Sequence, residues 1–250
     1  MPPSDRIGIA YVACSVPNGM HLETSPWTDV KDAAPTVALL PVGSTEQHGP
    51  HAPVGTDTII AQELASEAGR RSDLNSVVLP TIPVGIAPYH SHFPGTLSVS
   101  AETLRRYSYE ILTSLSDSSV ETVVFVNGHG GNGETLRNLT RTVADDSTVD
   151  LEVFLWEWMS AVDDHVNHAG ELETSMLLHI CPDEVGSPTD GDAATWDDTV
   201  DGGVVNRFTE EFSKNGAVGD ATSASAEQGE QLFETATDAL CSFLRRVDDL

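Results

Sequence analysis

The apolar positions of the chain fall in four continuous runs rich in β-branched residues, at 36–43, 76–85, 121–128 and 151–158. Because these runs do not alternate with polar residues, they predict strands that are covered on both faces. Segments with helical periodicity lie between them and begin at Asp57, Ser100 and Asn132, and a last amphipathic helix is expected at about 226–247. This order predicts right-handed parallel crossovers and an α/β fold, a three-layer α/β/α sandwich with a mostly parallel sheet.

The length of 250 residues suits a single domain, expected at 20–250 after an N-terminal extension at 1–19. The apolar run 7–16 is too short to cross a membrane, and its flank lacks the net basic charge of a signal peptide. The Asp- and Gly-rich stretch 183–203 is predicted to be a loop or excursion. Trp156 and Trp158 are expected to pack at the end of the fourth strand.

Charge narrows the choice of partners. The chain has 39 acidic and 12 basic residues, which gives a net charge of -27 and excludes nucleic acid and anionic membranes as partners. The acidic residues are spread rather than grouped in a tail, and they are typical of a surface adapted to high salt, where screening removes self-repulsion. Three separated cysteines without a C-x-x-C pair indicate a reduced protein, expected to be cytoplasmic.

Candidate chemistry follows the first predicted strand, at the edge of a parallel sheet where sites usually form. In VGSTEQHGPHAPVGTD, residues 42–57, Glu46 and His48 leave the same face of an extended segment, and Asp57 follows at a helix start. One imidazole and two carboxylates suit Zn, Mn or Fe(II). Taken singly, each residue has a simpler interpretation, as a surface charge, a loop histidine or a helix cap.

A second group, NGHGGN at 127–132, follows the third predicted strand. Its glycines, Gly128, Gly130 and Gly131, allow positive φ and close backbone approach, which a strand-to-helix turn needs if His129 is to point inward. The alternatives are an ordinary turn capped by Asn132 or a phosphate-binding loop, although no Lys or Ser follows in the P-loop arrangement.

A third group, NHAGELETSMLL at 167–178, offers His168 for proton transfer and Glu173 as a metal ligand or an orienting group. A glutamate in a first helical turn needs no catalytic reason, and Thr174 with Ser175 could cap this helix. Candidate substrate contacts are His92, Asn132 and Asn167, and His51 and His90 are further histidines for substrate contact or support.

Together, VGSTEQHGPH with GTD, FPGT at 93–96, NGHGGN, HAGELETS and GDATSASAEQGE at 219–230 resemble the creatininase (creatinine amidohydrolase) family from about Met20 onward. The resemblance implies a three-layer α/β/α fold, a dinuclear metal centre, hydrolysis of a non-peptide amide C–N bond in a small molecule, and a homo-oligomer, often a hexamer. By position, Glu46, Asp57 and His129 match the ligands of one divalent ion. His48 and Asp57 match those of the other, so Asp57 would bridge.

Two departures from the family pattern bear on the centre and on the substrate. Gly131 stands where creatininase has a second-metal glutamate, and Glu173 or solvent is the hypothesis for the missing ligand. Asp164 and Asn167 replace a Trp lid and a Glu that are specific to the creatinine enzyme. The motif forms are more similar to relatives that deformylate a formamidopyrimidine nucleotide in flavin and deazaflavin synthesis, the favoured function, or that trim the mycofactocin precursor peptide. The alternatives are creatinine hydrolysis and a non-enzymatic ligand-binding relative.

Overall fold

The computed structural model describes residues 19–162, 167–187, 199–200, 203–204 and 206–248. Most of the expected N-terminal extension, residues 1–18, and Asp164 lie outside these described residues. Within them, no helix combines the length and the hydropathy needed to cross a membrane.

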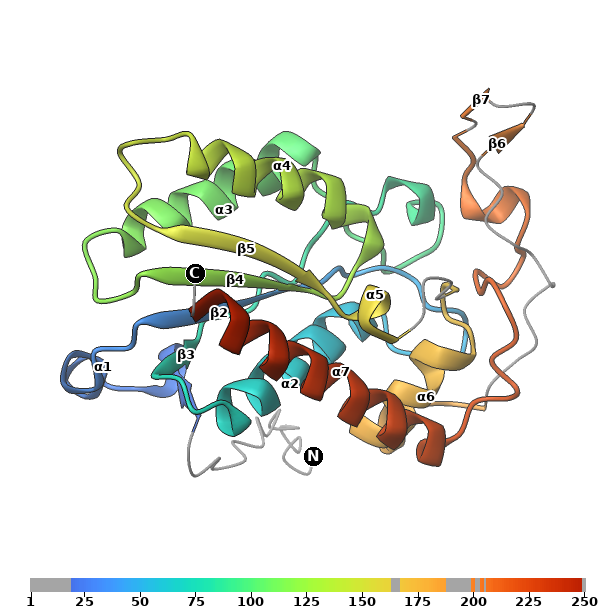
Figure 1. The fold of residues 1–250 in the computed structure, drawn as a ribbon. Helices are drawn as coiled ribbons and strands as arrows, with labels where there is room; N and C mark the ends of the chain where they lie inside the picture. Colours follow the sequence, from blue (N-terminus) through green and yellow to red (C-terminus); the bar gives the residue numbers. More distant parts are fainter. Residues whose placement is uncertain (1–18, 163–166, 188–198, 201–202, 205, 249–250) are drawn as a thin grey trace, which may run out of the picture.

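A five-stranded sheet in the order β1-β3-β2-β4-β5 forms the middle layer (Figure 1). Every strand pair in it is parallel, which confirms the predicted crossover topology. The strands are β1 (Met20–His21), β2 (Val37–Val42), β3 (Ser76–Val78), β4 (Thr122–Asn127) and β5 (Glu152–Glu157). The two-residue β1 was not predicted, because two residues are too few to show a pattern.

The predicted strand 76–85 is regular only over β3. Pro80 and Pro83 have no N–H group, so the ladder cannot continue through them. The chain nevertheless stays beside β2, because the N–H of Leu79 donates to Leu39 O at 2.8 Å and that of Ile82 to Pro41 O at 3.0 Å. The predicted path was therefore right and the predicted strand length was wrong.

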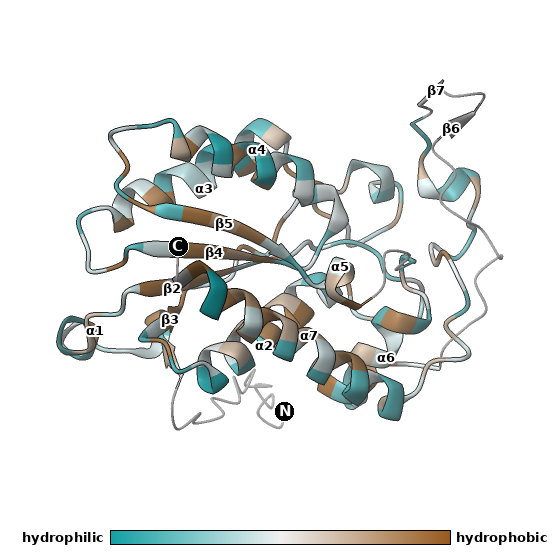
Figure 2. Cartoon of the chain, in the orientation of Figure 1, coloured by the Kyte–Doolittle hydropathy of each residue, from teal (hydrophilic) through white to brown (hydrophobic). Residues whose placement is uncertain are grey.

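Helices cover both faces of the sheet. On one face lie α3 (Ala101–Leu115) and α4 (Gly133–Ala144), and on the other lie α2 (Thr56–Arg71), α6 (Glu171–Ile180) and α7 (Ala226–Asp248) (Figure 1). Alternate residues of one strand enter the two cores, so that Leu40 packs toward α3 and α4 while Leu39 packs toward α2 and α7. Figure 2 shows the resulting apolar strands between helices whose outer surfaces are polar.

The remaining elements connect these layers. They are α1 (Trp27–Ala33), α5 (Trp158–Val162), the short hairpin β6 (Thr199–Val200) and β7 (Gly203–Val204), and five 3-10 turns at Leu22–Thr24, Pro88–His90, Gly130–Asn132, Pro182–Glu184 and Thr209–Glu211. Except for Val204, the hairpin falls within the predicted excursion 183–203, part of which lies outside the described residues. Trp156 and Trp158 are buried at the end of β5, as expected.

Helix starts were predicted with mixed success. Ser100 caps α3, since its side chain accepts the N–H of Thr103 at 3.1 Å. Asn132 precedes α4 but makes no cap bond, because its amide is used elsewhere. Thr174 and Ser175 do not cap α6, which already begins at Glu171 after Gly170.

Candidate metal centre

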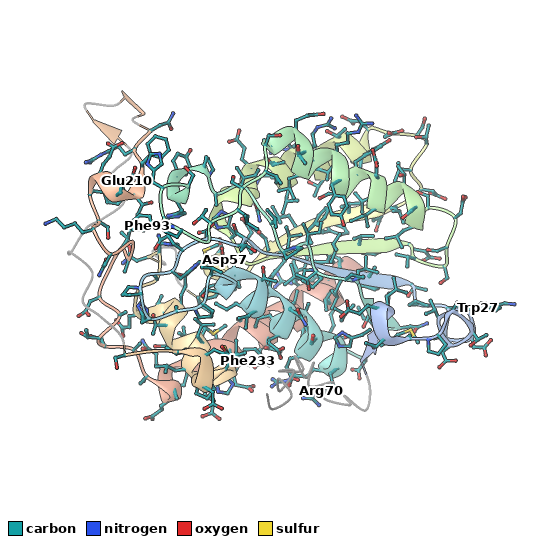
Figure 3. All side chains as sticks on the ribbon, turned by 180° about the vertical axis from the view of Figure 1, so that it is seen from behind. Trp27, Asp57, Arg70, Phe93, Glu210 and Phe233 are labelled. Atoms are coloured by element: carbon teal, nitrogen blue, oxygen red, sulfur yellow. The ribbon has the colours of Figure 1, made fainter. Side chains whose placement is uncertain are left out.

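A cavity of about 350 Å³ opens at the carboxyl edge of the sheet. Its walls include Glu46, Asp57, His129, His168 and Glu173, five of the six side chains predicted to bind metal or transfer protons. Asp57 lies toward the same end of the molecule as Phe93 and Glu210, and far from Trp27 (Figure 3). The polar residues that follow β2 and β4 thus converge as the parallel topology predicts.

Close backbone packing brings these segments together. Gly128 follows β4 and lies against the first turn of α2, where a Cβ atom at position 128 would be 2.2 Å from Asp57 O. The predicted close approach is therefore confirmed. The freedom to adopt positive φ is not used, because none of Gly128, Gly130 and Gly131 has a positive φ, and Gly130 and Gly131 lie in a 3-10 turn.

Asp57 lies at the centre of the cluster. Its Oδ1 is 3.1 Å from His48 Nε2, and its Oδ2 is 3.1 Å from His129 Nδ1. Glu46 Oε2 is 3.3 Å from His129 Nε2, and Glu173 Oε2 is 3.6 Å from His48 Nε2. One carboxylate therefore faces two imidazoles, each of which also faces a second carboxylate.

The cluster satisfies the chemical requirements of a cation site. Glu46, His48 and Asp57 are at most 1% exposed. Their atoms Glu46 Oε2, His48 Nε2 and Asp57 Oδ2 make the ion-pair contacts above, but none of the three makes a hydrogen bond of good geometry among the described residues. Such atoms are costly to bury unless a ligand or ion completes them. Potential ligand atoms lie within 4.8 Å of one another in two relevant groups, Glu46, His48 and Asp57, and His48, His168 and Glu173.

Gly131 lines the cavity but has no room for a side chain. A Cβ atom there would lie 2.3 Å from Ile86 O and 2.5 Å from His129 Nε2. A glutamate could not occupy this position without moving the neighbouring loop. Glu173 is the carboxylate that instead reaches His48, and its own Oε2 accepts the N–H of Ala169 at 2.6 Å.

Burial and mutual charge shift the pKa values of these groups when no metal is bound. Desolvation raises the pKa of Glu46 and of Glu173 to about 7. Burial opposes charge on His48 and His129, yet their carboxylate neighbours outweigh it and raise the pKa to about 10 and about 9, respectively. Burial likewise opposes charge on Asp57, but the two imidazoles hold its pKa far below the usual range. The metal-free pocket therefore holds protons where the cations would bind.

His168 borders the cavity beside this cluster. Its Nδ1 lies 3.5 Å from Glu46 Oε1, and its ring stacks on His90 with a centroid distance of 4.1 Å. Burial, with the positive charge of His48, holds the pKa of His168 well below its usual value, so the ring is neutral. A neutral imidazole at a cavity wall can accept and return a proton.

The three candidate substrate contacts lie in different surroundings. Asn167 lines the cavity. His92 is not among its lining residues; this half-exposed side chain pairs with Glu210 and stacks on Phe208. Asn132 is buried beneath the cavity, where its side chain accepts the N–H of Ile86 at 3.0 Å and donates to Gly43 O at 3.0 Å. These bonds hold the loops after β2 and β4 together.

Some residues of the site were not predicted. Tyr89 and Met159 line the cavity, and Gln47 contacts both His90 and His168. Tyr89 and Met159 carry no pattern that distinguishes them from other apolar residues. Gln47 lies between Glu46 and His48, and a side chain at that position of an extended segment is expected on the opposite face, so no local pattern marked it for this site.

The amino-acid sequence is similar to a known protein family and to several of its characterised members. The family profile described as creatininase, creatinine amidohydrolase, matches residues 23–244. The mycofactocin precursor peptide peptidase of Mycolicibacterium smegmatis is 36% identical over 243 residues, covering 92% of each chain. The creatinine amidohydrolase of Pseudomonas putida is 24% identical, over 85% of this chain and 90% of that one. The predicted greater similarity to the peptidase type than to creatininase proper is confirmed.

Solved structures show the same fold. A creatininase variant in a Zn–Zn form superposes with a TM-score of 0.77 at 23% identity, covering 91% of this chain and 98% of that one. The three-layer fold expected from the sequence is thereby confirmed.

Proposed function

The chain belongs to the creatininase family, and from that premise we propose that it hydrolyses an amide C–N bond with two divalent cations, Zn, Mn or Fe(II). The observation that carries the proposal is the convergence of buried, unsatisfied carboxylate and imidazole atoms on Asp57 beside a cavity. Glu46, Asp57 and His129 would hold one cation, and His48, Asp57 and Glu173 the other.

Asp57 and His168 have different roles in the proposed hydrolysis. When bound, cations of this kind acidify water and polarise a carbonyl oxygen. Asp57 fixes the positions of both His48 and His129, because each of its oxygens faces one imidazole. His168 stands at the cavity wall, where its Nδ1 accepts a proton and passes it to the departing nitrogen, which cannot leave as an unprotonated anion.

Two substrate classes are proposed. A peptide amide is supported by the 36% identity to a peptide peptidase along 92% of the chain. A formamidopyrimidine nucleotide, whose deformylation belongs to flavin and deazaflavin synthesis, is supported by the cavity, since about 350 Å³ lies within the range of small-molecule pockets. The family resemblance also implies a homo-oligomer, often a hexamer, and light scattering in molar salt tests whether this chain forms one.

The test combines metal analysis with turnover. Protein purified in molar salt should contain about two divalent ions per chain. Asp57→Asn should lose both ions and all activity, whereas His168→Ala should keep the ions and lose turnover. The assays use a formamide-bearing pyrimidine, creatinine and a mycofactocin-type precursor peptide.

Four results would count against the proposal. Fewer than one ion per chain, or full activity in Asp57→Asn, would contradict the metal centre. Phosphate binding without metal, together with no hydrolysis of any substrate, would favour a nucleotide-binding protein. A metal-loaded protein that binds but does not turn over these compounds would be a ligand-binding relative.

A further inference from the structure

The motif GDATSASAEQGE, residues 219–230, has no part in the site described so far. The structure describes all twelve residues, and none of them lines the cavity. The motif leads into α7, which lies beside α6 (Figure 1). A Cβ atom at Gly229 would lie 1.8 Å from Ser175 O, so the main chains of the two helices meet with no side chain between them. The motif therefore packs directly on the helix that carries Glu173.

Three hydrogen bonds join the motif to α6. The N–H of Ser225 donates to Ser175 Oγ at 3.1 Å, and the Ser175 hydroxyl donates to Gln228 Oε1 at 2.9 Å. Gln228 Nε2 in turn donates to Glu171 Oε1 at 2.9 Å. The directions are consistent, because a main-chain N–H only donates and a carboxylate only accepts. An amide oxygen at position 171 could accept the same bond, so the charge of Glu171 is not required. We call Ser175, Ser225 and Gln228 the α6–α7 clasp.

The turn before α6 is held from the same side. The N–H of Val218 donates to His168 O at 2.7 Å. The next residue, Ala169, has a φ of 53°, in the left-handed region that residues with side chains seldom adopt. Its N–H donates to Glu173 Oε2 at 2.6 Å. The segment that presents His168 and Glu173 to the cavity is thus fixed by Val218 at its start and by the clasp behind it.

The two proposed cation sites depend on α6 to different degrees. The ligands of the first, Glu46, Asp57 and His129, all come from the segments that follow β2 and β4. The second takes His48 and Asp57 from the same region and Glu173 from α6. A displacement of α6 would therefore withdraw a ligand from the second site and leave the first complete.

We propose that Ser175 and Gln228 are positioning residues, which hold α6 so that Glu173 reaches His48 and the second cation site is complete. The proposal rests on the proposed function and deepens it. It gives the motif 219–230 a role in metal binding although the motif supplies no ligand. Ser175 is fully buried, so no water can replace its two hydrogen bonds when the hydroxyl is removed.

The test is a zinc titration of metal-free protein in molar salt, in competition with a chelating dye, which measures the two affinities separately. Ser175→Ala and Gln228→Met should each weaken the second zinc about 10-fold, the lower end of the range for lost groups that support metal ligands. The first affinity should not change, and excess zinc should restore two ions per chain. Because both residues belong to one chain of hydrogen bonds, the double variant should lose little more than either single variant.

Leu240→Val is the matched control for a merely structural effect. Leu240 is fully buried in α7, and its position is about 18 Å along the helix from Gln228. Its truncation should lower the melting temperature and leave both zinc affinities unchanged.

Three results would overturn the role of the clasp. They are an unchanged second affinity in Ser175→Ala and Gln228→Met, equal weakening of both zinc ions in these variants, and the same weakening of the second ion in Leu240→Val. If Ser175→Ala does not fold, Gln228→Met decides, since Gln228 is only partly buried. Wild-type protein that binds fewer than two zinc ions would instead overturn the proposed function, and the role of the clasp with it.

Discussion

At the residue scale, the burial of Asp57 together with two further carboxylates and two imidazoles determines how the centre responds to protons. Without metal, the raised pKa values mean that His48 and His129 carry protons at neutral pH, stabilised by the adjacent carboxylates. A cation must displace those protons, since only neutral imidazole binds metal. Proton and cation therefore compete for the same atoms.

This competition predicts a pH dependence of metal affinity. Because both imidazole pKa values are raised, apparent zinc affinity should rise from pH 6 upward and level off only above pH 10, where His48 is mostly neutral even without metal. Calorimetry in buffers of different ionisation enthalpy should show proton release at pH 7.5 that diminishes toward pH 10. An affinity independent of pH over this interval would contradict the charge assignment.

Glu173 provides a second prediction at this scale. Glu173→Gln keeps the shape of the side chain but removes the charge that lies 3.6 Å from His48. We expect the number of bound ions to fall from two to one per chain, with the remaining ion at Glu46, Asp57 and His129. Metal analysis checks this, with Glu171→Gln on the same turn of α6 as the control. Two ions in Glu173→Gln would remove Glu173 from the ligand set.

The candidate metal ligands could be predicted from the sequence, whereas the residues that hold them in place through hydrogen bonds could not. Glu46, His48, Asp57 and His129 follow strand ends and have ligand chemistry, and the structure brings all four together. Gln47 and Asn132 support them, because their side-chain amides donate hydrogen bonds to main-chain oxygens that are distant in sequence. Such hydrogen bonds depend on tertiary packing, and the local sequence contains no pattern that predicts them.

At the element scale, the loop after β4 and the start of α2 meet with no side chain between them. Gly128→Ala would place a methyl group against Asp57 O, whose backbone belongs to a helix and cannot easily move. We expect a loss of about 1–3 kcal/mol in the free energy of unfolding, as in overpacked cores, and weaker zinc binding.

Gly55→Ala is the matched control for this change. It lies two residues before Asp57, and a Cβ atom there would have no heavy atom within 4 Å. Denaturant unfolding and zinc titration of the two variants should differ clearly. Equal effects would show that the close approach at Gly128 does not position Asp57.

The elements themselves were largely predictable because both faces of the sheet are buried. A continuous apolar run identifies such a strand, and β2, β4 and β5 lie within a residue of their predicted starts. The segment after β3 deviates because proline removes hydrogen-bond donors without changing hydropathy. Apolar patterning therefore locates a strand, whereas backbone chemistry sets its length.

At the scale of the whole molecule, the net charge of -27 predicts a dependence of stability on salt. Self-repulsion among the acidic residues acts in dilute buffer, and molar salt shortens the screening length to about 3 Å. The melting temperature should therefore rise between dilute buffer and 2 M KCl. Repeating the scan with zinc present separates screening from metal retention, and a melting temperature that does not rise would exclude salt adaptation.

The positions of the proposed ligands along the chain also have a consequence for biosynthesis. Glu46, His48 and Asp57 leave the ribosome early, while Glu173 follows more than a hundred residues later, roughly 6 to 23 s at ordinary rates of translation. During that interval a nascent chain displays three ligands without the partners that define the site, and intrinsic affinity then favours copper over manganese or iron. Correct metal loading thus depends on the timing of chain completion as well as on the finished geometry.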